Sequence, residues 1–428
     1  MSLIKNFQSL AKTREREVVL SLVEAALDAI QPENVLKKNF DLDRDQLTIQ
    51  SEDFNLKELK RIFLIGFGKG SARFSKILEN LLGQRLNGGN VIDVVGADFK
   101  KITFCQGVHP LPSKENIDFT RAVLADLKNK NLCEKDLVFV VVAGGGSVLF
   151  EAPARINLDK LIQVNQALLL SGADIYEINT IRKHLSLVKA GGLARALYPA
   201  KVIVLIISDV PGNDLSFVAS GPTVKDETRL DQAWSLIKKY NLDQKVDLSF
   251  DDLIETPKEE NYFKNVSNIL ILSNLTGLKA MRAKAETLGY GVEIISDRLR
   301  GDVEAVAKMF LEKQGSGKIF LAGGETTVKV KTNGRGGRNQ ALALSFLEKL
   351  KDNSVFCSFD SDGWDNTETA GALVDRLTLV RAAELNLNPE KFLEENNSFD
   401  FFQRTGDFIE TGRLGSNVSD LAVMLKLD

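Results

Sequence analysis

Residues 137–153 read LVFVVVAGGGSVLFEAP, and this stretch decides the fold. Its first six residues are an unbroken apolar run rich in β-branched side chains, which is typical of a strand buried on both faces of a parallel sheet. Glycines 144–146 then end the strand, and Ser147 is a good N-cap for a helix through Val148–Ala152. A strand, a glycine turn and a helix N-terminus offer backbone N–H groups and a favourable dipole to a phosphate, although a purely structural turn has the same composition.

Composition limits the class of protein. The chain has 428 residues, a net charge of −3, 44% hydrophobic and 26% charged residues, which indicates a globular protein of two domains. The sequence has no excess of positive charge of the kind that binds nucleic acid, no apolar run long enough to cross a membrane, and no apolar signal-peptide segment near Met1. Three scattered cysteines and two histidines argue against zinc and disulfides. We therefore expect a cytoplasmic protein, monomeric or homodimeric, with a small-molecule substrate and neither nucleic acid nor membrane as partner.

Apolar runs alternate with helical patterns along the chain, which predicts α/β domains. Residues 1–245 are expected to form a Rossmann-like, doubly wound domain, and residues 266–428 a second α/β domain. The polar stretch 241–265 is the predicted linker, with the terminal segment free to pack back on the first domain. Within the second domain, 326–331 alternates in polarity and predicts an exposed strand.

Glycine-rich and polar clusters follow many of the predicted strands. In open α/β sheets, ligands bind beyond the carboxyl ends of the strands, so one shared cleft between the two domains is the economical prediction. The clusters are Gly66–Ser71, Gly144–Ser147, Ser208–Thr223, Gly323–Thr326, Gly334–Asn339 and Ser361–Thr369.

Gly66–Ser71 reads GFGKGS and fits none of three known glycine loops. A Walker loop needs a longer spacing, and a kinase loop or a dinucleotide-binding turn needs a small residue other than Ser71 at its last position. Asp93 and Asp98 are only loosely placed for the acid that a dinucleotide site requires. Lys69 remains, and its ammonium suits a phosphate, although a solvated surface lysine fits equally well.

Other charged residues near predicted strand ends and helix starts are candidates for binding a metal ion, accepting a proton or binding an anion. Asp209 directly follows a predicted strand and could bind Mg²⁺, accept a proton or cap a turn. Arg335 and Arg338 stand among glycines at a predicted helix start, where guanidinium groups suit phosphate or carboxylate. Acids expected on the same rim are Glu325, Asp360, Asp362, Asp365 and Asp375.

Residues 179–189 read NTIRKHLSLVK and concentrate positive charge that could hold an acidic substrate. The residues concerned are Arg182, Lys183, His184 and Lys189. His184 has a packing role as its alternative, and His109, before Pro110, is expected to order a turn. Phosphate-type turns, cations in both halves and a carboxylate for a metal together indicate phosphoryl transfer, which requires mainly positioning and charge neutralisation.

Seven motifs in the same order resemble the glycerate 2-kinases, the two-domain enzymes with a C-terminal MOFRL domain. The likeness runs from about residue 66 to 425 through AGGGSVLFEAP, NTIRKHLSLVKAGGLA, ISDVPGNDLSFVASGPTVKDET, GGETTVKV, GRGGRNQALAL, SDGWDNTETAGALVD and TGRLGSNVSDL. The resemblance implies a phosphotransferase with an alcohol acceptor, using ATP and Mg²⁺ to convert D-glycerate to 2-phosphoglycerate in a cleft between two domains.

The resemblance also suggests residue roles. Lys69 and Arg338 would neutralise phosphoryl charge, Asp209 would be metal ligand or base, and Arg182 or Lys189 would hold the glycerate carboxylate. Predicted cofactor-binding residues are Gly66, Gly68, Gly144, Gly145, Gly146, Ser147, Ser220, Gly221 and Glu325; predicted substrate-binding residues are Arg182, His184, Lys189, Arg335 and Asp362.

The chain departs from the family pattern at several positions, which leaves the substrate preference open. These are Ala190, Ser361, Asn366, Ser416 and Ser419. Two other functions remain as alternatives: an NAD(P)H-dependent hydroxypyruvate reductase, which the incomplete dinucleotide pattern disfavours, and a non-catalytic nucleotide-binding regulator, which the paired charge clusters disfavour.

Overall fold

Two six-stranded sheets organise the computed structural model, which describes residues 2–350 and 353–427. One sheet lies in a unit made of Leu36–Ser208 and Asn213–Ile271, called the parallel-sheet unit below. The other lies in a unit made of Met1–Val35, Asp209–Gly212 and Leu272–Asp428, called the mixed-sheet unit. Within the described residues, no helix combines the length and apolarity needed to cross a membrane.

The first sheet has the strand order β6-β5-β4-β7-β8-β9, and the strand pairs from β6 to β8 are all parallel. This is the order of a doubly wound fold, in which the order of strand addition reverses between the two central, parallel strands, β4 and β7. The predicted doubly wound domain is therefore confirmed. Its strands are β4 (Arg61–Phe67), β5 (Leu86–Asp93), β6 (Ile102–Gln106), β7 (Asp136–Val142), β8 (Lys201–Ile207) and β9 (Val266–Leu272).

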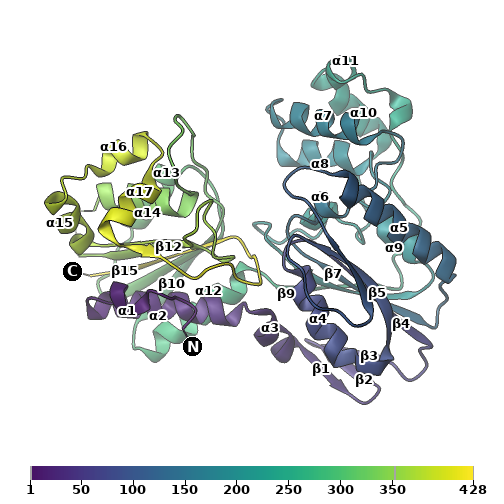
Figure 1. The fold of residues 1–428 in the computed structure, drawn as a ribbon, viewed down its shortest axis with the longest axis horizontal. Helices are drawn as coiled ribbons and strands as arrows, with labels where there is room; N and C mark the ends of the chain where they lie inside the picture. Colours follow the sequence, from purple (N-terminus) through teal and green to yellow (C-terminus); the bar gives the residue numbers. More distant parts are fainter. Residues whose placement is uncertain (1, 351–352, 428) are drawn as a thin grey trace. The chain divides into compact units, whose positions relative to one another are not determined.

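Helices connect these strands, and four of them gather at one end of the unit around a core of their own (Figure 1). The four are α7 (Leu158–Leu169), α8 (Ile175–Lys183), α10 (Leu230–Lys239) and α11 (Leu242–Lys245). The others are α3 (Pro32–Asn39), α4 (Ser71–Leu82), α5 (Lys114–Lys130), α6 (Gly146–Leu149) and α9 (Gly192–Leu197). A small antiparallel sheet, which the sequence patterns did not indicate, comprises β1 (Phe40–Asp43), β2 (Gln46–Ile49) and β3 (Glu52–Asn55).

The second sheet is mixed, with the order β10-β11-β15-β12-β13-β14. Only β10 and β11 run parallel; β15 lies antiparallel between β11 and β12. Its strands are β10 (Gly291–Leu299), β11 (Lys318–Gly324), β12 (Val355–Asp360), β13 (Gly371–Val374), β14 (Phe408–Ile409) and β15 (Asp420–Lys426). The predicted strand at 326–331 is wrong, since only an isolated bridge at Thr327 forms there.

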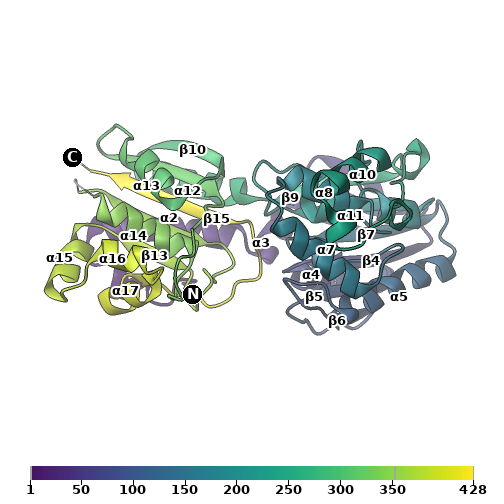
Figure 2. The ribbon, with the colours of Figure 1, turned by 90° about the horizontal axis from the view of Figure 1, so that it is seen from above.

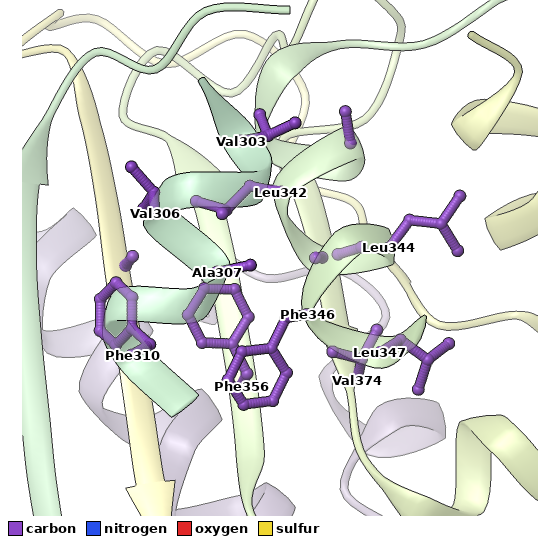
Figure 3. Close-up of a cluster of buried hydrophobic side chains, with 14 of the residues drawn as sticks. Val303, Val306, Ala307, Phe310, Leu342, Leu344, Phe346, Leu347, Phe356 and Val374 are labelled. Carbon is purple, nitrogen blue, oxygen red and sulfur yellow. The ribbon is translucent and has the colours of Figure 1, made fainter. Parts of the chain in front are cut away.

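Helices cover both faces of the mixed sheet (Figures 1 and 2). One face carries α2 (Arg14–Ala29) and α12 (Asn274–Thr287), and the other carries α13 (Val303–Leu311) and α14 (Arg338–Glu348). Figure 3 shows the core under α13 and α14, where Phe346 stacks on Phe356 with ring centroids 4.4 Å apart. The remaining helices are α1 (Phe7–Leu10), α15 (Arg376–Glu384), α16 (Pro389–Glu394) and α17 (Ser398–Thr405).

The compact units differ from the boundaries expected from the sequence. The predicted linker 241–265 packs into the parallel-sheet unit, where Leu242, Leu248 and Leu253 are buried, and β9 completes that sheet instead of opening the next domain. The C-terminal strand β15 lies inside the mixed sheet, between β11 and β12.

The N-terminal helix α2 also belongs to the mixed-sheet unit, and a buried arginine explains why. The guanidinium of Arg16 is fully buried and bonds Asp375 at 2.5 and 2.7 Å and Asp407 at 2.7 Å. An arginine buried at this depth requires such partners, and Thr378 supplies a further acceptor at 2.9 Å. Asp375, expected on the rim of the site, therefore anchors the N-terminal helix instead.

Candidate functional site

The two central strands of the parallel sheet end side by side, at the point where strand order reverses. Phe67 of β4 pairs with Val142 of β7, and the turn after each strand contacts the other, because Lys69 N donates to Gly144 O at 2.8 Å. A doubly wound fold binds its ligands at this switch point. Sequence reasoning thus located both glycine turns, and the structure brings Lys69 and the Gly144–Ser147 turn together.

Two of the predicted cofactor-binding glycines have a packing reason of their own. A Cβ on Gly66 would lie 2.5 Å from Ser75 Oγ, and one on Gly68 would lie 2.2 Å from the carbonyl oxygen of Ala143. Gly68 also has φ +102°, which side-chain-bearing residues rarely adopt. These glycines let the two turns approach each other, a requirement independent of any ligand.

The helix after the glycine turn is shorter than expected. It comprises four residues, Gly146–Leu149, and Gly145 with φ 74° occupies its N-cap position, so the prediction of Ser147 as N-cap and of a helix through 148–152 is wrong. Ser147 Oγ instead lies 2.8 Å from Ser220 Oγ, which in turn lies 3.3 Å from Asn179 Oδ1 of α8. A helix this short has little dipole, so backbone N–H groups carry any anion binding here.

The Ser220 segment is held in a strained conformation. Ala219, Ser220 and Gly221 have φ values of 49°, 61° and 62°, and two of them carry side chains. Residues of this kind persist where surrounding bonds fix them, and they cluster at functional sites. Ser220 O and Gly221 O accept from Ala190 N and Gly191 N at 2.9 Å each, which fixes this backbone beside the turn.

Lys69 is half-buried, and none of the described carboxylates lies within ion-pair distance of its ammonium. Its neighbour is His109, whose ring lies against Gly145. Burial, and then the positive charge of Lys69, lower the pKa of His109 to about 4. Sequence reasoning assigned His109 only a turn-ordering role, because nothing in its local pattern connects it to the glycine turn that begins at Gly144.

Two further cations lie on α8 and in the loop that follows it. Lys189 is buried and forms an ion pair with Glu151, which also accepts from Ser186 Oγ at 2.6 Å. Arg182 carries a buried Nε with no hydrogen-bond partner, and burial lowers its pKa despite the charge of Glu151. Two cations thus share one carboxylate, which leaves net positive charge for an anionic ligand.

His184 and Lys183 from the same motif are placed differently. His184 is fully buried, its Nδ1 lies 2.9 Å from the carbonyl oxygen of Thr180, and its Nε2 lies 3.4 Å from Glu255. Lys183 pairs with buried Asp226 at 2.9 Å. The structure therefore gives both residues packing contacts, whereas Arg182 and Lys189 share one buried carboxylate.

In the mixed-sheet unit, Arg338 begins α14 and faces three carboxylates. Asp420 receives two of its hydrogen bonds, at 2.6 Å from Nε and 3.1 Å from Nη2, Glu325 contacts Nη1, and Asp360 lies 3.7 Å from Nη2. The register of the sheet explains the cluster, since Asp420 at the start of β15 pairs with Asp360 of β12 and with Gly324 of β11. Sequence reasoning missed Asp420, whose partners are far away in the chain.

Two directly opposed aspartates are electrostatically costly. Burial and the neighbouring charge of Asp420 raise the pKa of Asp360 well above its ordinary range. Burial also raises the pKa of Asp420 to about 7, although Arg338 opposes the shift. Arg338 compensates this acidic cluster, and its pKa is raised accordingly.

The other sites predicted in this unit lie at the surface or within a polar network. Arg335 is exposed, bonds Glu368 at 3.0 Å and stacks on Phe399 at 4.2 Å. Asp362 accepts from Trp364 N at 2.8 Å in a turn. Asp365 is buried and accepts from Asn339 and Gln340 at the start of α14, so its role is to hold that helix.

Asp209 lies two residues after the end of β8, beyond the carboxyl edge of the parallel sheet, and is grouped with the mixed-sheet unit. In residues 2–350 and 353–427, no three His, Cys, Asp or Glu side chains gather into a metal-holding set. Mg²⁺ is commonly held by one or two carboxylates together with water and substrate phosphates, so a single carboxylate at Asp209 fits that ion.

Asp93 bears on the dinucleotide alternative. Its carboxylate is 1% exposed and accepts from Ala72 N at 2.9 Å, at the first turn of α4, and from Val94 N at 2.6 Å. The helix N-terminus that would receive a pyrophosphate is therefore already occupied by a carboxylate of the chain. This contact weighs against a dinucleotide in the usual position.

Fold and site define a class: a two-domain α/β protein with a doubly wound sheet, a glycine-rich turn at its switch point and a distinct mixed-sheet unit. Residues 18–255 match the family described as a domain of unknown function, DUF4147, and residues 318–420 match the MOFRL family. A glycerate 2-kinase of Pyrococcus horikoshii is 34% identical over 433 residues, covering 96% of this chain and 97% of that protein.

Two further relatives support the same assignment. A D-glycerate 2-kinase of Thermotoga maritima is 33% identical, covering 96% of this chain and 98% of its own length. The crystal structure of a glycerate kinase from the same organism matches with a TM-score of 0.84 at 31% identity, covering 96% of this chain and 99% of the other. The chain belongs to the glycerate 2-kinase family.

Proposed function

We propose that this protein transfers the γ-phosphoryl group of ATP to the 2-hydroxyl of D-glycerate. The observation that carries the proposal is the pair of incompletely compensated cations, Lys69 and Arg182, in the parallel-sheet unit of a chain whose relatives are named glycerate 2-kinases. Phosphoryl transfer depends on positioning and charge neutralisation, and both groups suit those tasks.

Glycerate carries one permanent charge, its carboxylate. Arg182 and Lys189 together have one counterion, Glu151, so a second carboxylate beside them would restore neutrality. The guanidinium also supplies the planar donor pair that a carboxylate accepts best. We assign these residues to holding the acid so that its hydroxyl is free to react.

Lys69 and Arg338 are assigned to the phosphoryl charge. Lys69 has no carboxylate competing for it in the described part of the chain, whereas Arg338 must give up one contact to receive an oxyanion. The contact with half-exposed Glu325 is the one that exchanges, since Asp420 is buried and bonds Arg338 twice. Asp420 would hold the guanidinium while Nη1 turns to the ligand.

Asp209 is the residue we assign to Mg²⁺, or to accepting the proton of the glycerate hydroxyl. A magnesium ion supplies charge neutralisation for the phosphates when it is bound. As a base, the carboxylate would need to approach the hydroxyl within hydrogen-bond distance. Asp209→Asn separates the two roles: loss of a metal ligand raises the Mg²⁺ concentration needed for half-maximal activity, whereas loss of a base lowers kcat at every Mg²⁺ concentration.

The test is product identity. Purified protein is incubated with ATP, Mg²⁺ and D-glycerate, and the product is separated into 2- and 3-phosphoglycerate by coupled enzymes. We expect 2-phosphoglycerate and one ADP per product. Production of 3-phosphoglycerate, or NADH-dependent consumption of hydroxypyruvate without any ATP turnover, would overturn the proposal.

A further inference from the structure

The imidazole of His109 lies beside the glycine turn that follows β7. A Cβ placed on Gly145 would meet His109 Cδ2 at 3.0 Å and Nε2 at 3.1 Å, and Lys69 Cγ at 3.7 Å. The side chains of His109 and Lys69 therefore flank the same glycine. Any side chain at 145 would displace them, so the glycine leaves room for both.

The polar groups around this glycine have no partners in the protein. Among residues 2–350 and 353–427, neither ring nitrogen of the half-buried His109 forms a hydrogen bond. The backbone N–H groups of Gly144 and Gly145 also find no acceptor within that part of the chain. Unused donors beside an uncompensated ammonium are the groups that suit an oxyanion, because N–H donors and a positive charge both favour it.

The protonation state decides what the imidazole can offer. Burial, reinforced by the charge of Lys69, keeps the pKa of His109 near 4, so the ring is neutral at pH 7. A neutral imidazole has one N–H donor and one acceptor nitrogen. It can thus donate to an anion without adding a second full charge beside Lys69.

We propose that His109 contacts the ligand of this turn and donates a hydrogen bond to an oxyanion, supplied by the polyphosphate of a nucleotide or by the carboxylate of a hydroxy acid. The inference rests on the proposed function only in the choice of those two ligands. It adds a binding residue that the sequence motifs do not contain.

The chain has two histidines, which makes the experiment direct. Imidazole ¹H–¹⁵N correlation spectra of the ¹⁵N-labelled full chain give one signal set each for His109 and His184, assigned with His109→Asn. The buried His184 is the internal control. Separate titrations with ATP, with D-glycerate and with inorganic phosphate distinguish the source of the oxyanion.

We expect the His109 signals to shift saturably with ATP or with D-glycerate, while those of His184 stay in place. In parallel, His109→Phe should weaken binding of that same ligand by about 10- to 100-fold in calorimetry, the usual range for a hydrogen bond to a charged group. His109→Asn, which keeps an N–H donor, should recover part of the loss.

Three results would overturn the inference: no shift of the His109 signals with either ATP or D-glycerate although calorimetry shows saturation, equal movement of both histidines, or no binding of any of the three anions. Failure of the proposed function looks different. If ATP moves His109 but no phosphoglycerate forms, the inference stands and the kinase proposal fails. If 2-phosphoglycerate forms and His109 stays unshifted, the inference fails alone.

Discussion

Asp420→Asn should lower the catalytic rate through Arg338, although Asp420 itself does not face the reaction. The buried carboxylate receives two hydrogen bonds from the guanidinium, at 2.6 and 3.1 Å, and one from Asn339 at 2.9 Å. An asparagine of the same shape keeps one acceptor oxygen, so it loses one of the two bonds to Arg338 and places an amide N–H against the other donor.

The magnitude follows from positioning. A misplacement of about 1 Å of a charge-stabilising group costs on the order of 10²-fold in rate. We therefore expect kcat with ATP and D-glycerate to fall about 10²-fold, with little change in KM for glycerate. Glu325, the more exposed carboxylate that contacts Arg338, provides the control substitution. Glu325→Gln removes a carboxylate that competes with ATP for Nη1 of Arg338, so it should lower KM for ATP by about 5-fold or less.

The assay is steady-state kinetics combined with a double-mutant cycle. If Asp420 acts by holding Arg338, Asp420→Asn has no further effect on kcat in an Arg338→Met background, whereas a purely structural role would lower activity and stability in both backgrounds. Urea unfolding monitors stability in parallel. A variant Asp420→Asn with wild-type kcat, or with an undiminished effect in the Arg338→Met background, would refute the reasoning.

Three further predictions concern stability, pH and substrate binding. Arg16→Met leaves two buried aspartates unpaired and should destabilise the mixed-sheet unit by about 3–5 kcal/mol in urea unfolding, against less than about 1 kcal/mol for Arg229→Met in an exposed ion pair. Burial raises the pKa of Asp93 to about 6 from its ordinary 3.8, so the folded protein binds this proton more tightly than the unfolded chain does. The protonated Asp93 therefore contributes to the free energy of unfolding below pH 4, and this contribution is lost as the pH rises through 6. In the wild-type protein, the free energy of unfolding should fall by up to about 3 kcal/mol between pH 4 and 7 because of Asp93, and Asp93→Asn should remove this fall. If urea unfolding gives the same dependence of stability on pH in both proteins, the prediction is contradicted. Arg182→Leu should raise KM for D-glycerate about 10-fold or more while leaving KM for ATP nearly unchanged, and equal effects on both would contradict the assignment.

The doubly wound sheet was predictable because its signals are local. Apolar β-branched runs such as 137–142 and 202–207 define buried strands, and glycine turns directly after them mark the carboxyl edge. The sequence pattern therefore placed both glycine turns at that edge, and it left Lys69 as either a phosphate ligand or a solvated surface lysine. The strand order brings them together, as expected for neighbours at the switch point.

The unpredicted parts depend on contacts between distant residues. Arg16 reaches aspartates more than 350 positions away, so no local pattern places α2 in the mixed-sheet unit. The antiparallel register of β12 and β15 places Asp420 opposite Asp360. The ring of His109 lies against Gly145, which belongs to a different turn of the chain. The polar residues of 241–265 resembled a linker because their few buried leucines show no regular period.

We propose that Lys69 and Arg338 both neutralise phosphoryl charge during the transfer. The most direct measurement is kcat for ATP and D-glycerate in Lys69→Met and in Arg338→Met, with folding checked by urea unfolding. Removal of one preorganised charge typically costs 10²–10³-fold in kcat. We predict a loss of at least about 10²-fold in each variant with the fold intact; near-wild-type turnover in either one would contradict the account.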